Sequence, residues 1–288
     1  LGKLNVYVTS KGQNIPGLIK VINSSPVLAD IQKVIAPFTK PNGIADVFLN
    51  IYGTAKNAET IEFNKDLFSK GTVTLHNAST VLQDTYLPFT RVNGVVNFNQ
   101  YDSDYDINGY VRNSKLLVKG TGSDSNIDLV AQSGKFAIED CSDLLYPQMN
   151  LPYQKEVGKI NISFVGRYKG VADTNKLDYN KIKVDGKFLS NKNSSNPIKV
   201  NSGTFTIHNG VLKTSTIAGL FNNNSYTLSL VVNDIYNTMN ISSAVFNFKN
   251  FDISVINTIK NQIKLPKEIA AQIDSISNIK GSIAVSYT

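Results

Sequence analysis

The stretch DSDYDINGYVRNSK, residues 102–115, spaces its carboxylates in the way that calcium loops do. From Asp104 the order D-x-D-x-N-G matches the start of an EF-hand loop. Such a loop also needs a bidentate Glu at its twelfth position, and here that position is Lys115. Because an ammonium group cannot ligate a cation, we expect a polar turn at this point and no metal site.

The other residues with chemical potential stand alone. His76 in TLHNA and His208 in TIHNG have no second His, Cys or acid at ligand spacing. Cys141 is the only cysteine and has no basic neighbour to activate it, so a buried, inert thiol is expected. GTGSDS at 120–125 lacks the lysine of a phosphate loop. The sequence therefore predicts no catalytic residue, no cofactor and no metal, and so no enzyme.

The composition narrows the classes of partner. The net charge of +7 comes from scattered lysines, and the only arginines are Arg91, Arg112 and Arg167. A protein that binds nucleic acid usually carries clustered arginines, so no nucleic-acid partner is expected. No apolar run approaches the roughly 18 residues of a spanning helix. The chain opens with LGKLNVYV and shows no signal peptide, so we interpret it as a fragment of a longer protein.

A strand that follows a glycine recurs along the chain. GKINISFVG, which begins at Gly158, alternates apolar and polar residues with the period of two that is typical of a half-exposed strand. GIADVFLNIYG begins in the same way at Gly43, and GSIAVSYT at Gly281. Each is preceded by a short helical pattern and a proline. We predict four parts: 1–42, the end of a repeat with a short helix; 43–157 and 158–280, two full repeats, the second ending in an amphipathic helix; and 281–288, the first strand of a further repeat.

Between these glycines, strands of 5 to 8 residues recur with Asn, Gly, Ser and Asp between them. The pattern predicts an all-β chain with an elongated, mainly antiparallel sheet that has one apolar face. A sandwich would cover that face with a second sheet. A unit that repeats lengthwise favours an open, curled trough with short helices at the repeat ends. The residues expected to line its apolar groove are Val96, Phe98, Leu129, Phe136, Ile138, Ile160, Ile162, Phe164, Phe205, Ile207, Leu228 and Leu230.

The repeats resemble those of the AsmA-like superfamily, which contains the TamB-type and YhdP-type proteins. In that family, strings of glycine-led strands are joined by a segment that starts with proline and ends in G-x-(apolar)-x-F, matched here from Pro88 to Phe98. A strand followed by D-(L/I)-x-x-(apolar) falls on Phe136 to Leu145. The second repeat keeps Gly203 but departs from the pattern in SSNPIKVNS. The likeness covers roughly residues 40 to 255.

The resemblance implies a β-groove protein of the cell envelope of a diderm bacterium. It would be anchored in the inner membrane through a segment outside this chain, cross the periplasm, and carry phospholipids to the outer membrane. The implied partners are phospholipid acyl chains and the two membranes, and self-association through sheet edges is expected. Two alternatives stay open: a structural or adhesive surface β-repeat protein, and a TamB-like factor of outer-membrane protein assembly.

Overall fold

The structure, a computed structural model, describes residues 2–24, 38–55, 66–82, 87–100, 102–123, 126–141, 154–171, 178–236, 240–252 and 280–287. The strands form one antiparallel sheet that is not closed into a barrel, so the all-β prediction and the open sheet are confirmed. The chain divides into two compact units: unit 1 holds Leu1–Ser133 and Gly166–Lys181, and unit 2 holds Gly134–Val165 and Ile182–Thr288. In the described segments, no helix has the length and hydropathy needed to cross a membrane.

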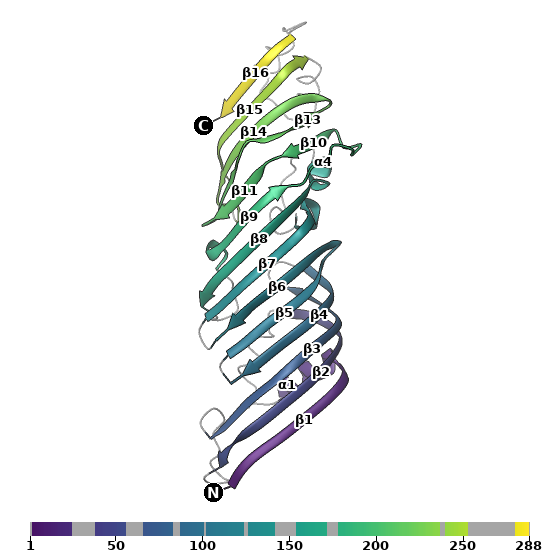
Figure 1. Cartoon of the computed structure of the whole chain (residues 1–288), viewed down its shortest axis with the longest axis vertical. Coiled ribbons are helices and arrows are strands. Elements are labelled where there is room, and N and C mark those ends of the chain that lie inside the picture. The colour runs from purple at the N-terminus through teal and green to yellow at the C-terminus, as the bar shows by residue number, and fades with distance from the viewer. Residues whose placement is uncertain are drawn as a thin grey trace. The chain divides into compact units, whose positions relative to one another are not determined.

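Unit 1 is a meander in which each strand pairs with the next (Figure 1). Its strands are β1 (Gly2–Asn14), β2 (Phe38–Ala55), β3 (Leu67–Leu82), β4 (Leu87–Asn99), β5 (Asp102–Val111) and β6 (Ser114–Gly122). The beginning of β7 (Asn126–Ala137) and the end of β8 (Asn161–Val171) complete it. Helix α1 (Ile15–Ser24) follows β1, and the Asn14 side chain caps it by accepting from the Gly17 N–H at 3.2 Å.

Unit 2 continues the antiparallel pairing in a different order. Along the sheet the strands run β9 (Ile182–Phe188), β11 (Thr204–His208), β12 (Val211–Thr214), β14 (Asn224–Asn233), β13 (Ile217–Phe221) and β10 (Ile198–Ser202). Strand β15 (Asn240–Asp252) also pairs with β14, and β16 (Lys280–Tyr287) pairs with β15. The short helical elements η2 (Ile138–Cys141) and α4 (Gln154–Gly158) belong to unit 2, and η3 (Tyr179–Lys181) belongs to unit 1.

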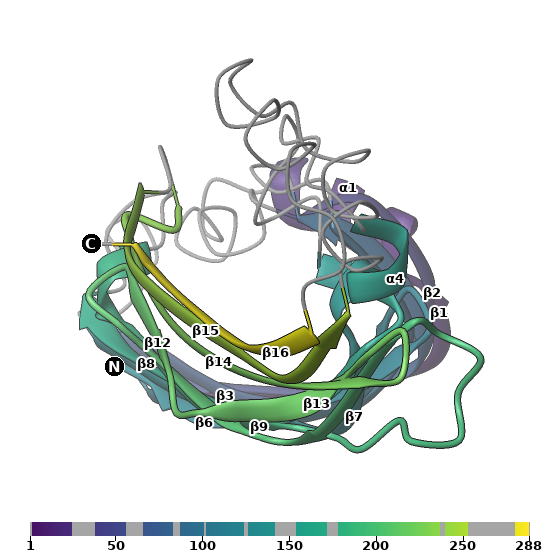
Figure 2. The ribbon, with the colours of Figure 1, turned by 90° about the horizontal axis from the view of Figure 1, so that it is seen from above.

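Bulges bend the strands of unit 1. The register shifts between Ser10 and Gln13 in β1, between Leu75 and Ala78 in β3, and between Thr90 and Asn93 in β4. The extra residues include Gly12, Asn77 and Arg91, which adopt φ values of 65°, 48° and 52°. A bulge bends its strand and increases its twist, so a series of bulges on neighbouring strands curls the sheet. The strands of each unit are accordingly curved (Figure 2).

Two expectations from the sequence differ from the structure, and a third falls on residues that the structure does not describe. The stretch from Asp104 to Val111 is not a polar turn but part of β5, because Tyr105 and Ile107 alternate with polar residues. The turn is confined to Arg112 and Asn113. Cys141 is half-buried, and its Sγ contacts the Ile138 carbonyl at 3.2 Å. The helical patterns expected at 25–37 and 253–279, including the amphipathic helix, lie outside the described residues. The division into repeats remains a prediction.

Candidate functional site

The strands of unit 1 place a continuous series of apolar side chains on one face, here called the apolar face. Directly opposite residues of an antiparallel pair share a face, so the registers connect residues into rows. One row consists of Ser10, Val47, Val73, Val96, Tyr105, Gly120 and Leu129, and the next of Val8, Leu49, Gly71, Phe98, Ser103, Gly122 and Ile127. A third row holds Gln13, Ala45, Leu75, Gly94, Ile107, Val118 and Ala131. No charged residue occurs in these rows.

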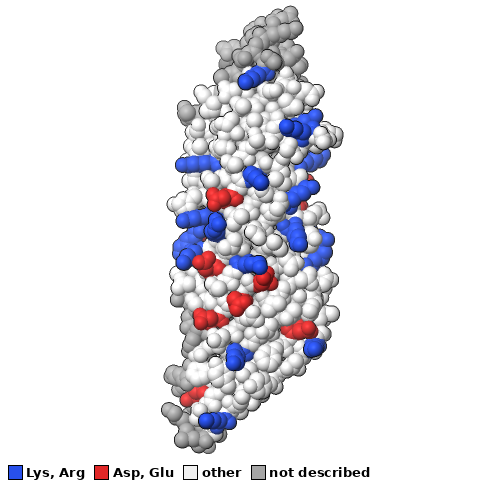
Figure 3. Space-filling model, viewed as in Figure 1, with Lys and Arg blue, Asp and Glu red and all other residues white. Residues whose placement is uncertain are grey.

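The opposite side of the same strands, here called the polar face, carries the charges (Figure 3). Thr72 donates to Asn97 at 2.8 Å, and Asn97 donates to Asp104 at 2.8 Å, so hydrogen bonds run across three strands. Lys119 forms an ion pair with Asp106 at 2.7 Å. Both side chains of that pair are more than half exposed, so the pair contributes little to stability. The two faces therefore differ in polarity: the charged side chains lie on one face, and the registered rows of the other hold none.

A hollow of about 660 Å³ lies near the ends of β4 to β7, and its lining comes from both faces. Asn97, Asp104, Thr121 and Asp128 line it from the polar face, and Lys169 lies 3.7 Å from Asp128. Phe98, Ser103, Gly122 and Ile127, which also line it, belong to the second apolar row. No group of three or more His, Cys, Asp or Glu side chains arranged to hold a metal ion occurs in the described segments. The lining of the hollow therefore mixes polar and apolar residues and has no ligand set that would mark a metal centre.

The predicted groove residues of unit 1 lie together on the apolar face. Val96 and Leu129 share one row, and Phe98 lies in the adjacent row. All three side chains are half-buried. A side chain in this state retains surface that an apolar ligand could cover, because it is not enclosed on all sides.

The predicted residues of unit 2 lie in a more enclosed environment. Ile160 belongs to a buried cluster with Val200, Ile217, Phe221, Tyr226 and Phe248, against which Ile138 and Leu228 also pack. Phe136 and Phe205 are only 4% and 6% exposed, and the Phe136 ring lies 5.4 Å from the Phe164 ring. Ile162, Phe164, Ile207 and Leu230 are half-buried. Burial also raises the pKa of Tyr226 to about 12, so its hydroxyl stays neutral at physiological pH.

Apolar side chains that lie over glycines are a feature that the sequence reading missed. The Phe98 ring covers Gly71, its partner across the ladder, and the Phe205 ring covers its partner Gly186 in the same way. A Cβ at Gly186 would lie 2.2 Å from the Phe205 ring. Leu129 similarly lies over Gly120. These side chains therefore lie over the backbone of the neighbouring strand. The sequence signal that could have revealed this feature is a glycine placed opposite a bulky apolar residue on the neighbouring predicted strand.

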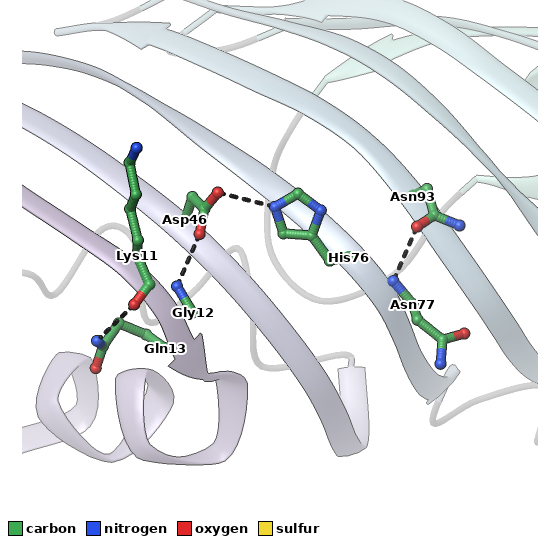
Figure 4. A network of polar contacts seen from close by, with 7 residues as sticks. All are labelled: Lys11, Gly12, Gln13, Asp46, His76, Asn77 and Asn93. Carbon is green, nitrogen blue, oxygen red and sulfur yellow. Dashed lines mark hydrogen bonds and ion pairs between the residues drawn. The ribbon is translucent and has the colours of Figure 1, made fainter.

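His76 has an acidic partner that its sequence neighbourhood did not reveal (Figure 4). Asp46 comes from the neighbouring strand, and its Oδ2 lies 3.0 Å from His76 Nε2. Its Oδ1 accepts a hydrogen bond from the Gly12 N–H at 2.7 Å, which satisfies the backbone of the β1 bulge. The next bulge uses Asn93, which accepts from the Asn77 N–H at 2.9 Å. These polar groups hold the bend of the sheet, and we assign them a structural role.

The contacts of Asp46 with Gly12 and His76 predict that the stability of the fold depends on pH. The hydrogen bond from Gly12, followed by that from His76, holds the pKa of Asp46 below its ordinary value. A lowered folded-state pKa stabilises the fold above the unfolded pKa of about 3.9, and this contribution is lost as pH falls through the folded pKa. We expect Asp46→Asn to lower the melting temperature at pH 6, and we expect this effect to disappear as pH falls through the folded-state pKa of Asp46.

Thermal melts from pH 2 to pH 7 test this. His76→Ala is the matched control, since it retains the Gly12 bond and should keep most of the pH dependence. A melting difference between wild type and Asp46→Asn that is constant over the whole range would contradict the assignment.

The described residues thus offer a charge-free, half-exposed apolar face in unit 1, an enclosed apolar cluster in unit 2, and polar groups that hold the bend of the sheet. No protein-family model, no curated protein and no solved structure matches this chain.

Proposed function

We propose that the apolar face accommodates the acyl chains of phospholipids, in a segment of a bridge that carries lipid between the inner and outer membranes of a diderm bacterium. The bridge would lie in the periplasm and be anchored in the inner membrane by a segment outside this chain. The observation that carries the proposal is the absence of charge from the registered rows of β1 to β7, combined with the half-buried state of Val96, Phe98 and Leu129.

The free energy available from covering an acyl chain with the apolar face is sufficient for binding. Each CH₂ group removed from water contributes about 0.8 kcal/mol, so a 16-carbon chain could gain on the order of 10 kcal/mol as an upper bound. A lipid seated only in part would gain proportionally less. Binding therefore does not need a specific contact with the headgroup.

The character of the face also suits movement. A lipid held by a strong hydrogen bond or ion pair would be retained at one position, because leaving a buried polar group unpaired is costly. Rows of Val, Leu, Ile and Phe with intervening glycines present similar contacts from one strand to the next. An acyl chain could shift by one strand without losing a unique partner.

Photocrosslinking of neighbouring positions on β4 tests the proposal. Phe98 lies on the apolar face, whereas the adjacent Asn97 lies on the polar face and bonds to Thr72 and Asp104. With benzoylphenylalanine at each position in turn, the purified chain is irradiated with vesicles of radiolabelled phosphatidylethanolamine and phosphatidylglycerol. We expect several-fold more labelled lipid at position 98 than at position 97. Equal labelling of both positions, or none at 98, would reject the acyl-binding face.

A further inference from the structure

The hollow near the ends of β4 to β7 lies where the apolar face of unit 1 reaches the ends of its strands. On the second apolar row, Phe98 and Ile127 line it from β4 and β7, and only Ser103 and Gly122 stand between them. Because these two residues carry almost no side chain, the hollow opens between two bulky apolar groups. The Tyr105 hydroxyl accepts from Ser103 at 2.7 Å and brings a polar group to the same place. The apolar face thus ends in a space with both apolar and hydroxyl neighbours.

The other side of the hollow carries a net negative charge. Its described lining holds three carboxylates, Asp102, Asp104 and Asp128, and one ammonium group, on Lys169. Asp104 accepts one hydrogen bond from Asn97 at 2.8 Å, and Asp128 lies 3.7 Å from Lys169. A carboxylate can accept several hydrogen bonds, so these groups can accept more donors than they now have. The hollow therefore attracts cationic groups and repels anionic ones.

A ligand that suits both sides of the hollow is cationic at one end and apolar at the other. An ethanolamine headgroup has an ammonium group with three N–H donors, and its phosphate can accept from a lysine. A glycerol headgroup brings the phosphate but no cation to balance the carboxylates. A small soluble amine brings the cation but leaves Phe98 and Ile127 uncovered.

We propose that the hollow receives the headgroup of an aminophospholipid, with its ammonium group at Asp102 and Asp104, its phosphate at Lys169, and its acyl chains starting between Phe98 and Ile127. The inference rests on the proposed function, because it assigns a headgroup to the lipid on the apolar face. The Lys169 ammonium group lies beside Asp128 on β7, two strand spacings or about 10 Å from β5. A phosphoethanolamine group with a hydrogen bond at each end spans a comparable distance.

This contact selects a lipid without fixing it in place. The side chains of Asp128 and Lys169 are 52% and 82% exposed, and Asp102 and Asp104 are exposed as well. Ion pairs at exposed positions are weak and are screened by salt. The hollow therefore biases which lipid is held by a few-fold, while the apolar rows supply the contacts along which a lipid can move.

The composition of the bound lipid tests the inference. The purified chain is incubated with vesicles of equimolar phosphatidylethanolamine and phosphatidylglycerol and re-isolated, and its bound lipids are quantified by mass spectrometry. We expect a several-fold excess of phosphatidylethanolamine on the wild type and a ratio near one for the double variant Asp102→Asn, Asp104→Asn. Asp102→Lys with Asp104→Lys should favour phosphatidylglycerol, since the lining becomes positive. Asp106→Asn is the matched control, because Asp106 lies on the same strand and face but pairs with Lys119 outside the hollow, and it should keep the wild-type ratio.

The outcomes separate the headgroup from the acyl chain. Equal amounts of the two lipids on the wild type would overturn the headgroup assignment and leave the acyl-binding face intact. A wild type that binds neither lipid would reject the proposed function and the headgroup assignment with it. Water-soluble glycerophosphoethanolamine, added in an amount equimolar with the lipid, should not displace phosphatidylethanolamine. Displacement would identify a site for the free headgroup and overturn the assignment to a lipid.

Discussion

Replacing Ile160 by aspartate should unfold unit 2. Ile160 is 4% exposed and belongs to the buried cluster formed with Val200, Ile217, Phe221, Tyr226 and Phe248. An uncompensated carboxylate in such a cluster costs about 3–5 kcal/mol, a large part of the 5–15 kcal/mol that stabilises a typical domain. We expect loss of the cooperative thermal transition of unit 2, measured by circular dichroism and calorimetry.

The matched control is Ile160→Val, which removes one methylene group and should cost about 1 kcal/mol. A second comparison uses Ile162→Asp, two residues further along the chain, where the side chain is half-buried. Water can reach a half-buried carboxylate, so this variant should melt at a temperature between those of Ile160→Val and Ile160→Asp. Melting of Ile160→Asp close to that of the wild type would show that the cluster is open to water.

The sequence was sufficient to predict the strands and their two faces. Alternation at Val96 and Phe98, and at Ile160, Ile162 and Phe164, reports directly on which side chains share a face, since the period of a strand is two. The sheet follows because exposed backbone must pair, and short polar turns favour antiparallel neighbours. These local rules were enough for the all-β class and for the open sheet, without any information on tertiary contacts.

The difference in burial between the units could not be predicted in this way. Leu129 and Phe205 both alternate within strands, yet Leu129 is half-buried and Phe205 is 6% exposed. Phe205 lies over Gly186 and its ring is 5.4 Å from that of Phe188, which comes from a strand that is not its sequence neighbour. Such contacts depend on the order β9, β11, β12, β14, β13, β10, which periodicity does not encode.

The polar contacts that stabilise the bulges also could not be predicted from local sequence patterns. Asp46 and His76 are 30 residues apart, and Gly12 is 34 residues from Asp46. Only the register of three strands brings them together, with the bulge in β1 opposite Asp46. Glycine and asparagine are typical of positive φ, but the sequence does not say which of the many such residues in this chain bend a strand and which form turns.

A charge on the apolar face of unit 1 should abolish lipid binding while the fold survives. Leu129 lies on that face over Gly120 and is half-buried, so Leu129→Asp leaves its carboxylate within reach of water and should cost about 1–3 kcal/mol. In the proposed function the same carboxylate would have to be dehydrated wherever an acyl chain covers it, which opposes binding. We expect native mass spectrometry to show copurifying phospholipid on the wild type and none on this variant.

The adjacent Val130 provides the control. It is also half-buried, but it lies on the polar face opposite Lys119, which can pair with a new carboxylate. Val130→Asp should therefore keep both its melting temperature and its bound lipid. Unfolding of Leu129→Asp would indicate that the apolar face of unit 1 is a sealed core. If Leu129→Asp stays folded and retains as much phospholipid as Val130→Asp, the proposal is wrong for this row of the sheet. The bound lipid would then lie at another place on the protein, since an acyl chain cannot cover a charged carboxylate.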